Sequence, residues 1–301
     1  MTAARHVLLT AVFTALTVVV TLALLQALGP DWTRFLPATC LASHCFCELP
    51  RTGNLLLQPA NSWSSFGFVG VGIWIMLGAR IRPASARPVS ALAGFAAGWF
   101  GFTAIVIGVG SVALHASLTL WGQFADVLGM YLLGSFTLAW AVMRWRGLST
   151  AAAITLYLLV AGGLVGALWV WPETRRWLFA VLLVTAIAVE WWLARPRRPG
   201  VRSQLLLSGL AANALAFAIW VADQAGTLCA PASPWQGHAC WHLLGAVALA
   251  CSHGYYRSEI ARKPRVPVRG GLWSSCHMPL RPRSYKEVHL VRRNQTGRGR
   301  L

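Results

Sequence analysis

The chain has 301 residues, of which 56% are apolar and only 11% are charged, and its mean hydropathy is +0.57. A soluble domain carries about 25% charged residues and a disordered chain has low hydropathy, so both classes are excluded. The net charge of +18 does not indicate a nucleic-acid-binding protein, because 12 of the 26 basic residues lie in residues 257–301 and the rest lie in short clusters between apolar stretches. This distribution is typical of a polytopic membrane protein.

Eight apolar stretches are long enough to cross a bilayer, which needs about 20 residues in helical form. They are residues 7–28, 62–81, 89–116, 123–143, 150–171, 176–193, 204–222 and 235–253. The apolar residues run continuously and do not alternate with polar ones, which favours helices over a β-barrel. The predicted fold class is therefore all-α, a polytopic membrane helix bundle with a seven-helix core and one extra N-terminal transmembrane helix.

The basic residues predict the orientation of the bundle. With a cytoplasmic N-terminus, 22 of the 26 basic residues lie in cytoplasmic segments, as the positive-inside rule requires. We expect residues 1–30 to be an N-terminal transmembrane helix or signal anchor, and a cleaved signal peptide is the alternative. Residues 31–61 are expected to be an extracytoplasmic loop, residues 62–256 a seven-helix catalytic bundle, and residues 257–301 a disordered basic cytoplasmic tail.

The tail has few aromatic residues for base stacking, so we expect it to lie against an anionic membrane surface and to bind no nucleic acid. Arginine far outnumbers lysine and the chain is rich in Ala and Gly, which suggests a bacterial cytoplasmic membrane. The sequence predicts no particular oligomeric state.

Four cysteines fall in the predicted extracytoplasmic loops, where thiols oxidise. They are Cys40, Cys45, Cys47 and Cys229. We expect a disulfide that joins the two loops, with Cys47–Cys229 as the pair, and Cys40–Cys45 is a second candidate pair. A zinc site at Cys45 and Cys47 is the alternative.

Polar residues inside the predicted spans are few, and ionisable groups in a bilayer are candidates for function. Ser111 and His115 lie near the end of the third span, Asp126 near the start of the fourth, and His238 and His242 at the start of the eighth. In the topology derived from the arginines, all five residues lie in the extracytoplasmic half of the membrane. The sequence therefore predicts that they form one site.

The spacing of the histidines favours a metal. His238 and His242 are four residues apart and share a helix face, and His115 from another helix supplies a third imidazole. Three protein nitrogens with an open fourth position are the pattern of a catalytic zinc site. The alternative is that each histidine only hydrogen-bonds a neighbouring helix. Another membrane carboxylate, Glu190, stands beside Trp191 and Trp192 and is interpreted as an interfacial anchor.

At these residues the sequence resembles the alkaline ceramidase family, within the superfamily of adiponectin-receptor-type membrane hydrolases. The matching motifs are Gly110-Ser111-x-x-x-His115-Ala116-Ser117-Leu118, Gln123-x-x-Asp126 and Gly237-His238-x-x-Trp241-His242. The resemblance implies a seven-helix ceramidase-like core, zinc bound by His115, His238 and His242, and Ser111 and Asp126 acting beside the metal.

The family also has a calcium site before its first core helix. Cys47, Glu48 and Asn61 match that pattern, but Cys45 and Gln58 stand where carboxylates are expected. Calcium needs several oxygen ligands, so we do not expect the calcium site to be retained.

The expected function is a zinc-dependent intramembrane amidase that hydrolyses ceramide or a related N-acyl lipid to a free long-chain amine and a fatty acid. Its partners are then the lipid substrate and the membrane. Asp126 would act as general base and Ser111 would stabilise the oxyanion. The alternative is a non-catalytic seven-helix lipid receptor or scaffold with a structural zinc.

Overall fold

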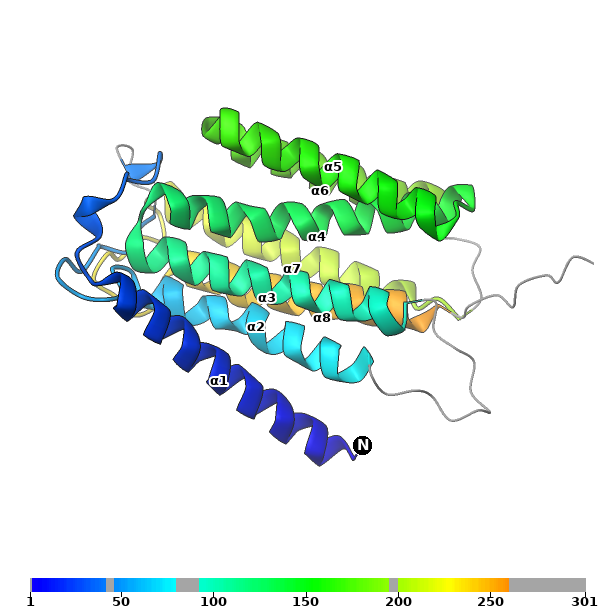
Figure 1. Ribbon diagram of the computed structural model, residues 1–301, viewed down its shortest axis with the longest axis horizontal. Helices are drawn as coiled ribbons and strands as arrows, with labels where there is room; N and C mark the ends of the chain where they lie inside the picture. Colours follow the sequence, from blue (N-terminus) through cyan, green and yellow to red (C-terminus); the bar gives the residue numbers. More distant parts are fainter. Residues whose placement is uncertain (1, 42–45, 80–91, 195–199, 260–301) are drawn as a thin grey trace, which may run out of the picture. The chain divides into compact units, whose positions relative to one another are not determined.

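The computed structural model describes residues 2–41, 46–79, 92–194 and 200–259. In these ranges the chain forms eight α-helices and no β-strand (Figure 1). The helices are α1 Ala3–Leu28, α2 Pro59–Ala79, α3 Gly94–Ser117, α4 Leu120–Arg146, α5 Thr150–Val170, α6 Arg175–Ala188, α7 Ser203–Gln224 and α8 Gly237–Ser258. The predicted all-α helix bundle is confirmed, and each helix falls on one predicted apolar stretch. Residues 260–301, nearly all of the predicted tail, lie outside the described residues.

Seven helical stretches of the described part are long and apolar enough to cross a membrane. They are α1 to α5, α7, and α6 extended at both ends to Pro172–Ala194. The remaining helix, α8, has 22 residues and is also long enough, but its three histidines and Arg257 make it more polar. Its histidines at 238, 242 and 253 are all buried, so this polarity faces other helices. The chain is an integral, multi-pass membrane protein.

Helix α3 is the centre of the packing. It lies between α2 and α4, while α8 packs against α2 and α7, and α5 and α6 pack against α4. Helix α1 packs on α2, and Figure 1 shows it beside α2 and away from α5 and α6. Helices α1, α5 and α7 leave most of their apolar surface exposed, as lipid-facing helices do, whereas most of α3 is buried.

Glycines allow the central helices to approach closely. A Cβ on Gly72 of α2 would lie 2.5 Å from the Gly101 carbonyl oxygen of α3, and a Cβ on Gly101 would lie 2.6 Å from the Gly72 carbonyl oxygen. No side chain fits in either place. Because lipid tails are as apolar as side chains, such backbone contact between small residues is what holds membrane helices together.

The reversal between α3 and α4 is short and tightly bonded. Leu118 ends α3 in the left-handed region, with φ of 49°, and its carbonyl oxygen accepts a hydrogen bond from the Ala38 amide. Thr119 then caps α4, where its hydroxyl oxygen accepts from the Gly122 amide. A left-handed leucine is uncommon, and here the loop at Ala38 fixes it. The turn places the start of α4 directly alongside the end of α3.

The interpretation of Glu190 as an interfacial anchor is wrong. Glu190 lies in a π-helical turn over Val189–Ala194 and is buried, with an ion pair to Arg144 of α4 at 2.6 Å. Arg144 also pairs with Glu259 at 2.6 Å, and the Tyr255 hydroxyl donates to Glu190. A carboxylate is buried in a membrane protein only with such partners. Glu190 therefore joins α4 and α8 to the end of α6, and the neighbouring tryptophans hid this role in the sequence.

Candidate metal centre

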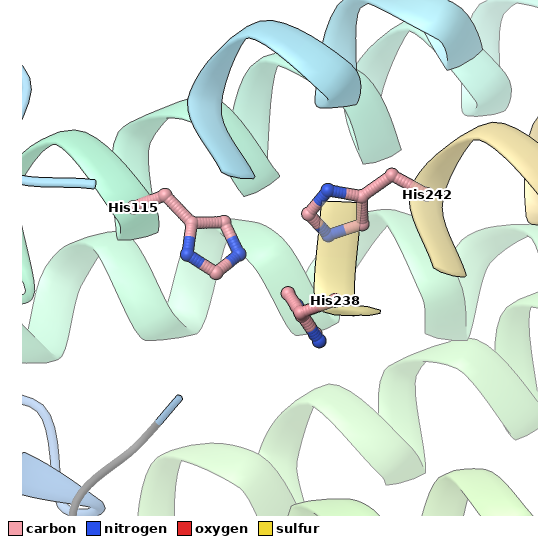
Figure 2. A group of neighbouring side chains, drawn as sticks. All are labelled: His115, His238 and His242. Atoms are coloured by element: carbon pink, nitrogen blue, oxygen red, sulfur yellow. The ribbon is translucent and has the colours of Figure 1, made fainter. Parts of the chain in front are cut away.

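Three buried imidazoles from two helices meet at one end of the bundle. His115 comes from the last turns of α3, and His238 and His242 come from the first two turns of α8. Their ligand atoms all lie within 4.8 Å of one another. Figure 2 shows His115 of α3 facing the two histidines of α8. The three predicted ligands are thus brought together, and the group could hold a metal ion.

The hydrogen bonds of Gln58 define which nitrogen of His115 is free. The Gln58 amide nitrogen donates to the Glu48 carbonyl oxygen at 2.7 Å, so its Oε1 must face His115. That Oε1 lies 2.8 Å from His115 Nδ1, and an oxygen can only accept, so Nδ1 carries the proton. The lone pair of His115 is then on Nε2, where a metal would bind it.

His242 is oriented in the same way by α2. Its Nδ1 lies 3.1 Å from the Asn61 carbonyl oxygen, 2.8 Å from the Ser64 hydroxyl and 3.2 Å from the Ser65 hydroxyl. Both hydroxyls donate to the Asn61 carbonyl, so their oxygens accept from the imidazole. Nδ1 is therefore protonated and Nε2 again carries the lone pair.

The third imidazole completes a donor set that fits zinc. Nδ1 of His238 is buried and, among the described residues, has no hydrogen-bond partner. In the part of the chain that the structure describes, the group has three imidazole nitrogens and no thiolate or fourth protein ligand, the donor set of a catalytic zinc site with one open position. The outer hydrogen bonds on His115 and His242 are also the kind that orient metal-ligating histidines.

Ser111 and Asp126 lie beside this group. The Ser111 hydroxyl oxygen is 3.3 Å from Nε2 of His242, and the Asp126 carboxylate lies close to the Ser111 side chain. Asp126 is in the second turn of α4 and is only partly buried. All five predicted site residues therefore lie at one place, with the hydroxyl of Ser111 and the carboxylate of Asp126 beside the three histidines.

Comparison with known proteins decides the family. A family model described as Ceramidase matches residues 56–265, which cover α2 to α8. The chain belongs to the ceramidase family. No curated protein matches the sequence.

Membership in the ceramidase family gives the protein a coarse function. Ceramidases are hydrolases that cleave the amide bond of ceramide, so the family supports a lipid substrate and a membrane setting. The match begins at residue 56 and leaves out α1.

The ceramidase calcium site does not fit the residues present. The Glu48 carboxylate accepts from the Ala60 amide at 2.8 Å and from the Asn61 amide at 2.9 Å, so it caps the N-terminus of α2. Burial raises the pKa of Glu48, while those two amides act in the opposite direction. Gln58 is neutral and its oxygen serves His115. Cys45 lies outside the described residues, and a calcium ion would have to displace the helix cap.

The disulfide between the two loops is confirmed. Cys47 is bonded to Cys229, which follows α7, across 182 residues of sequence. The second candidate pair, Cys40–Cys45, includes a residue outside the described ranges. Because the Cys47 thiol is consumed in the disulfide, the alternative zinc site at Cys45 and Cys47 is wrong.

The sequence reasoning missed the residues that orient the histidines. Asn61, Ser64 and Ser65 form a polar cluster in an otherwise apolar helix, and this spacing was a signal that one face of α2 contacts a polar site. In the sequence, Gln58 matches only a position of the family's calcium pattern. Its contact with His115 depends on a loop fold that the sequence does not reveal.

Replacement of Gln58 by leucine is expected to lower zinc affinity about 10- to 100-fold, the usual effect of removing a partner of a metal-bound histidine. The leucine side chain fits the volume but cannot accept the proton of His115 Nδ1. Competition with a coloured zinc chelator measures the affinity. Gln58→Glu is the matched control, because a carboxylate still accepts from Nδ1, and it should bind zinc nearly as well as the natural chain. Equal affinity of the leucine variant would contradict the assignment.

Gly110→Ala is expected to separate α4 from α3. A Cβ at this position would lie 2.2 Å from the Ala125 carbonyl oxygen and 2.9 Å from the Asp126 amide nitrogen. Displacement of Asp126 by about 1 Å should lower turnover about 100-fold while the histidines still bind metal. Gly98→Ala is the control, because a Cβ at Gly98 on the same helix has no atom within 4 Å. Wild-type turnover of Gly110→Ala would show that this contact does not position Asp126.

Proposed function

We propose that the chain is a zinc-dependent intramembrane amidase that hydrolyses ceramide or a related N-acyl lipid to a free long-chain amine and a fatty acid. The observation that carries this proposal is the buried group of three histidines, two of which present an Nε2 lone pair toward the others. A Zn²⁺ ion held there would supply Lewis acidity, polarising the amide carbonyl and making a nearby water more acidic.

Asp126 has the position of a general base. It takes a proton from the water that attacks the amide carbonyl and later gives that proton to the leaving nitrogen, so that the C–N bond breaks to an amine and a carboxylic acid. Its partial exposure allows it to reach a substrate, unlike the buried Glu48 and Asp223.

Ser111 is proposed to donate a hydrogen bond to the carbonyl oxygen of the substrate as that oxygen becomes negatively charged. Its hydroxyl oxygen is 3.3 Å from Nε2 of His242 and lies close to the Asp126 carboxylate. Once Asp126 holds a proton, that carboxyl group can donate to the Ser111 oxygen, and the Ser111 hydroxyl is then free to donate to the developing oxyanion. A hydrogen-bond donor placed in this way contributes most in a site that excludes water.

The loop end of the bundle is proposed to face the extracytoplasmic side of a bacterial cytoplasmic membrane. The arginine distribution supports this orientation, since it leaves only four basic residues in the loops at that end. The Cys47–Cys229 disulfide supports it as well, because disulfides persist in oxidising compartments.

Incubation of the purified protein with acyl-labelled ceramide, together with metal analysis, tests the proposal. We expect about one zinc per chain and release of labelled fatty acid, and removal of zinc by a chelator should stop the release. Bound zinc with no hydrolysis of any N-acyl lipid would instead support the alternative, a receptor or scaffold with a structural zinc. Ser111 and Asp126 favour the enzyme, because a structural metal would need neither.

A further inference from the structure

An aromatic ring covers two of the three histidines from the loop side. The centroid of the Phe46 ring lies 4.5 Å from that of His115 and 4.3 Å from that of His238. Among the described aromatic side chains, Phe46 alone contacts both imidazoles, whereas the phenylalanine nearest His242 is Phe68, at 6.4 Å. Phe46 belongs to the loop that precedes α2.

The order of residues along the helices shows which side of the site Phe46 closes. His115 is one turn nearer the end of α3 than Ser111, and His238 is one turn nearer the start of α8 than His242. Phe46 therefore lies toward the loops, and Ser111 and His242 lie toward the centre of the bundle. On the loop side of the site, the Phe46 ring thus lies against His115 and His238.

The Phe46 ring is held by its own packing and by the bonds of the residues that follow it. The ring packs on Ala38, Cys40 and Leu114. The next three residues are each fixed, since Cys47 is bonded to Cys229, the Glu48 carboxylate caps α2, and the Leu49 amide donates to the Pro231 carbonyl at 3.0 Å. Two loops that are far apart in sequence thus hold Phe46 over the site.

We propose that Phe46 is a specificity-determining lid, which closes the loop-side approach and restricts the site to acyl amides that reach it from the bilayer. The claim that substrates reach the site from the bilayer rests on the proposed amidase function. The claim that Phe46 closes the loop side of the site does not. An apolar ring against two imidazoles offers no hydrogen bond to a polar amide that arrives from solution. A long-chain amide does not need to enter from the loop side, because its acyl chains remain in the hydrocarbon core of the bilayer.

Carbethoxylation of histidines in lipid nanodiscs tests the closure, with metal first removed by a chelator and each histidine followed by peptide mass spectrometry. In Phe46→Ala we expect about tenfold faster modification of His115 and His238, as for sites that lose local protection, and little change at His242. His242 is the internal control for folding, because the same variant would expose it too if the bundle opened. Equal increases at all three histidines, or no increase at any, would overturn the proposal.

Three further variants sharpen this result. Phe46→Leu keeps an apolar side chain, so its histidines should be modified nearly as slowly as those of the natural chain.

Phe35→Ala removes a ring of the same loop that packs on Trp32 and Trp121. It should leave the modification rates of all three histidines unchanged. The double variant Cys47→Ser with Cys229→Ser should expose His115 and His238 selectively, because it releases the lid; wild-type protection in it would show that the disulfide does not hold Phe46.

Substrate preference tests the second half of the proposal. The kcat/KM ratio for a water-soluble short-chain N-acyl amide over long-chain ceramide should rise about tenfold in Phe46→Ala. An unchanged ratio would overturn the role in specificity. If the natural chain hydrolyses neither amide, the amidase function and the specificity role both fail, and the modification rates still decide whether Phe46 closes the site.

Discussion

Replacement of His242 by alanine is expected to remove the bound metal and to lower ceramide turnover by at least about a thousandfold, comparable to the loss of a main electrostatic stabiliser of the oxyanion. Two imidazoles would remain, which is fewer than the three protein ligands of known catalytic zinc sites. The variant also breaks the contacts of Nδ1 with Asn61 and Ser64. Metal content by plasma mass spectrometry and fatty acid release from labelled ceramide measure the two effects.

His253→Ala is the matched control for this experiment. His253 lies on the same helix and is equally buried, but it contacts Trp74 and Phe100 and does not belong to the three-histidine group. Its replacement should lower the melting temperature by opening a cavity, while zinc content stays at the natural level. If His242→Ala keeps its zinc, or if His253→Ala loses it, the assignment of the metal ligands is wrong.

Asp126→Asn is expected to retain zinc and to lose about 10²- to 10⁴-fold in turnover, the range for removal of a general base. The amide has nearly the shape of the carboxylate, so the packing of α4 on α3 should not change. It can still accept a hydrogen bond from Ser111, but it cannot take a proton from water. Single-turnover kinetics on zinc-loaded protein separate this chemical defect from a loss of substrate binding.

A buried acid at the same end of the bundle, Asp223, serves as the control for Asp126→Asn. Asp223 accepts from the Gly237 amide at 3.0 Å and so caps the N-terminus of α8. Asparagine keeps that hydrogen bond, so Asp223→Asn should turn over ceramide within about twofold of the natural chain, because asparagine caps helices as well as aspartate does. Natural turnover in Asp126→Asn would refute the role of Asp126 as general base.

The arrangement of helices and the five polar site residues could be predicted because both follow from local patterns. Hydropathy marks the spans, and the alternating direction of successive spans places His115, Asp126 and His238 at one end of the bundle. The four-residue spacing of His238 and His242 then follows from helix geometry alone. None of these steps requires knowledge of how the loops fold.

The surroundings of the site could not be predicted in the same way. Gln58, Ser64 and Phe46 contact histidines that lie 57 to 192 positions along the chain, and each contact depends on the path of a loop or the rotation of a helix. Glu190 shows the same limit, since its partner Arg144 becomes visible only once α4 and the end of α6 are packed together. Side-chain neighbours across helices are set by tertiary packing and are not encoded in local periodicity.

The position of His238 and His242 on the last helix has a consequence for biosynthesis. Two of the three imidazoles, and the Cys229 partner of Cys47, belong to the final third of the chain, so a ribosome must make seven helices before the three-histidine group can form. A nascent or truncated polypeptide that ends before residue 238 retains His115 with no second imidazole of the group. On the proposed function, hydrolytic capacity therefore arises only in chains long enough to include α8.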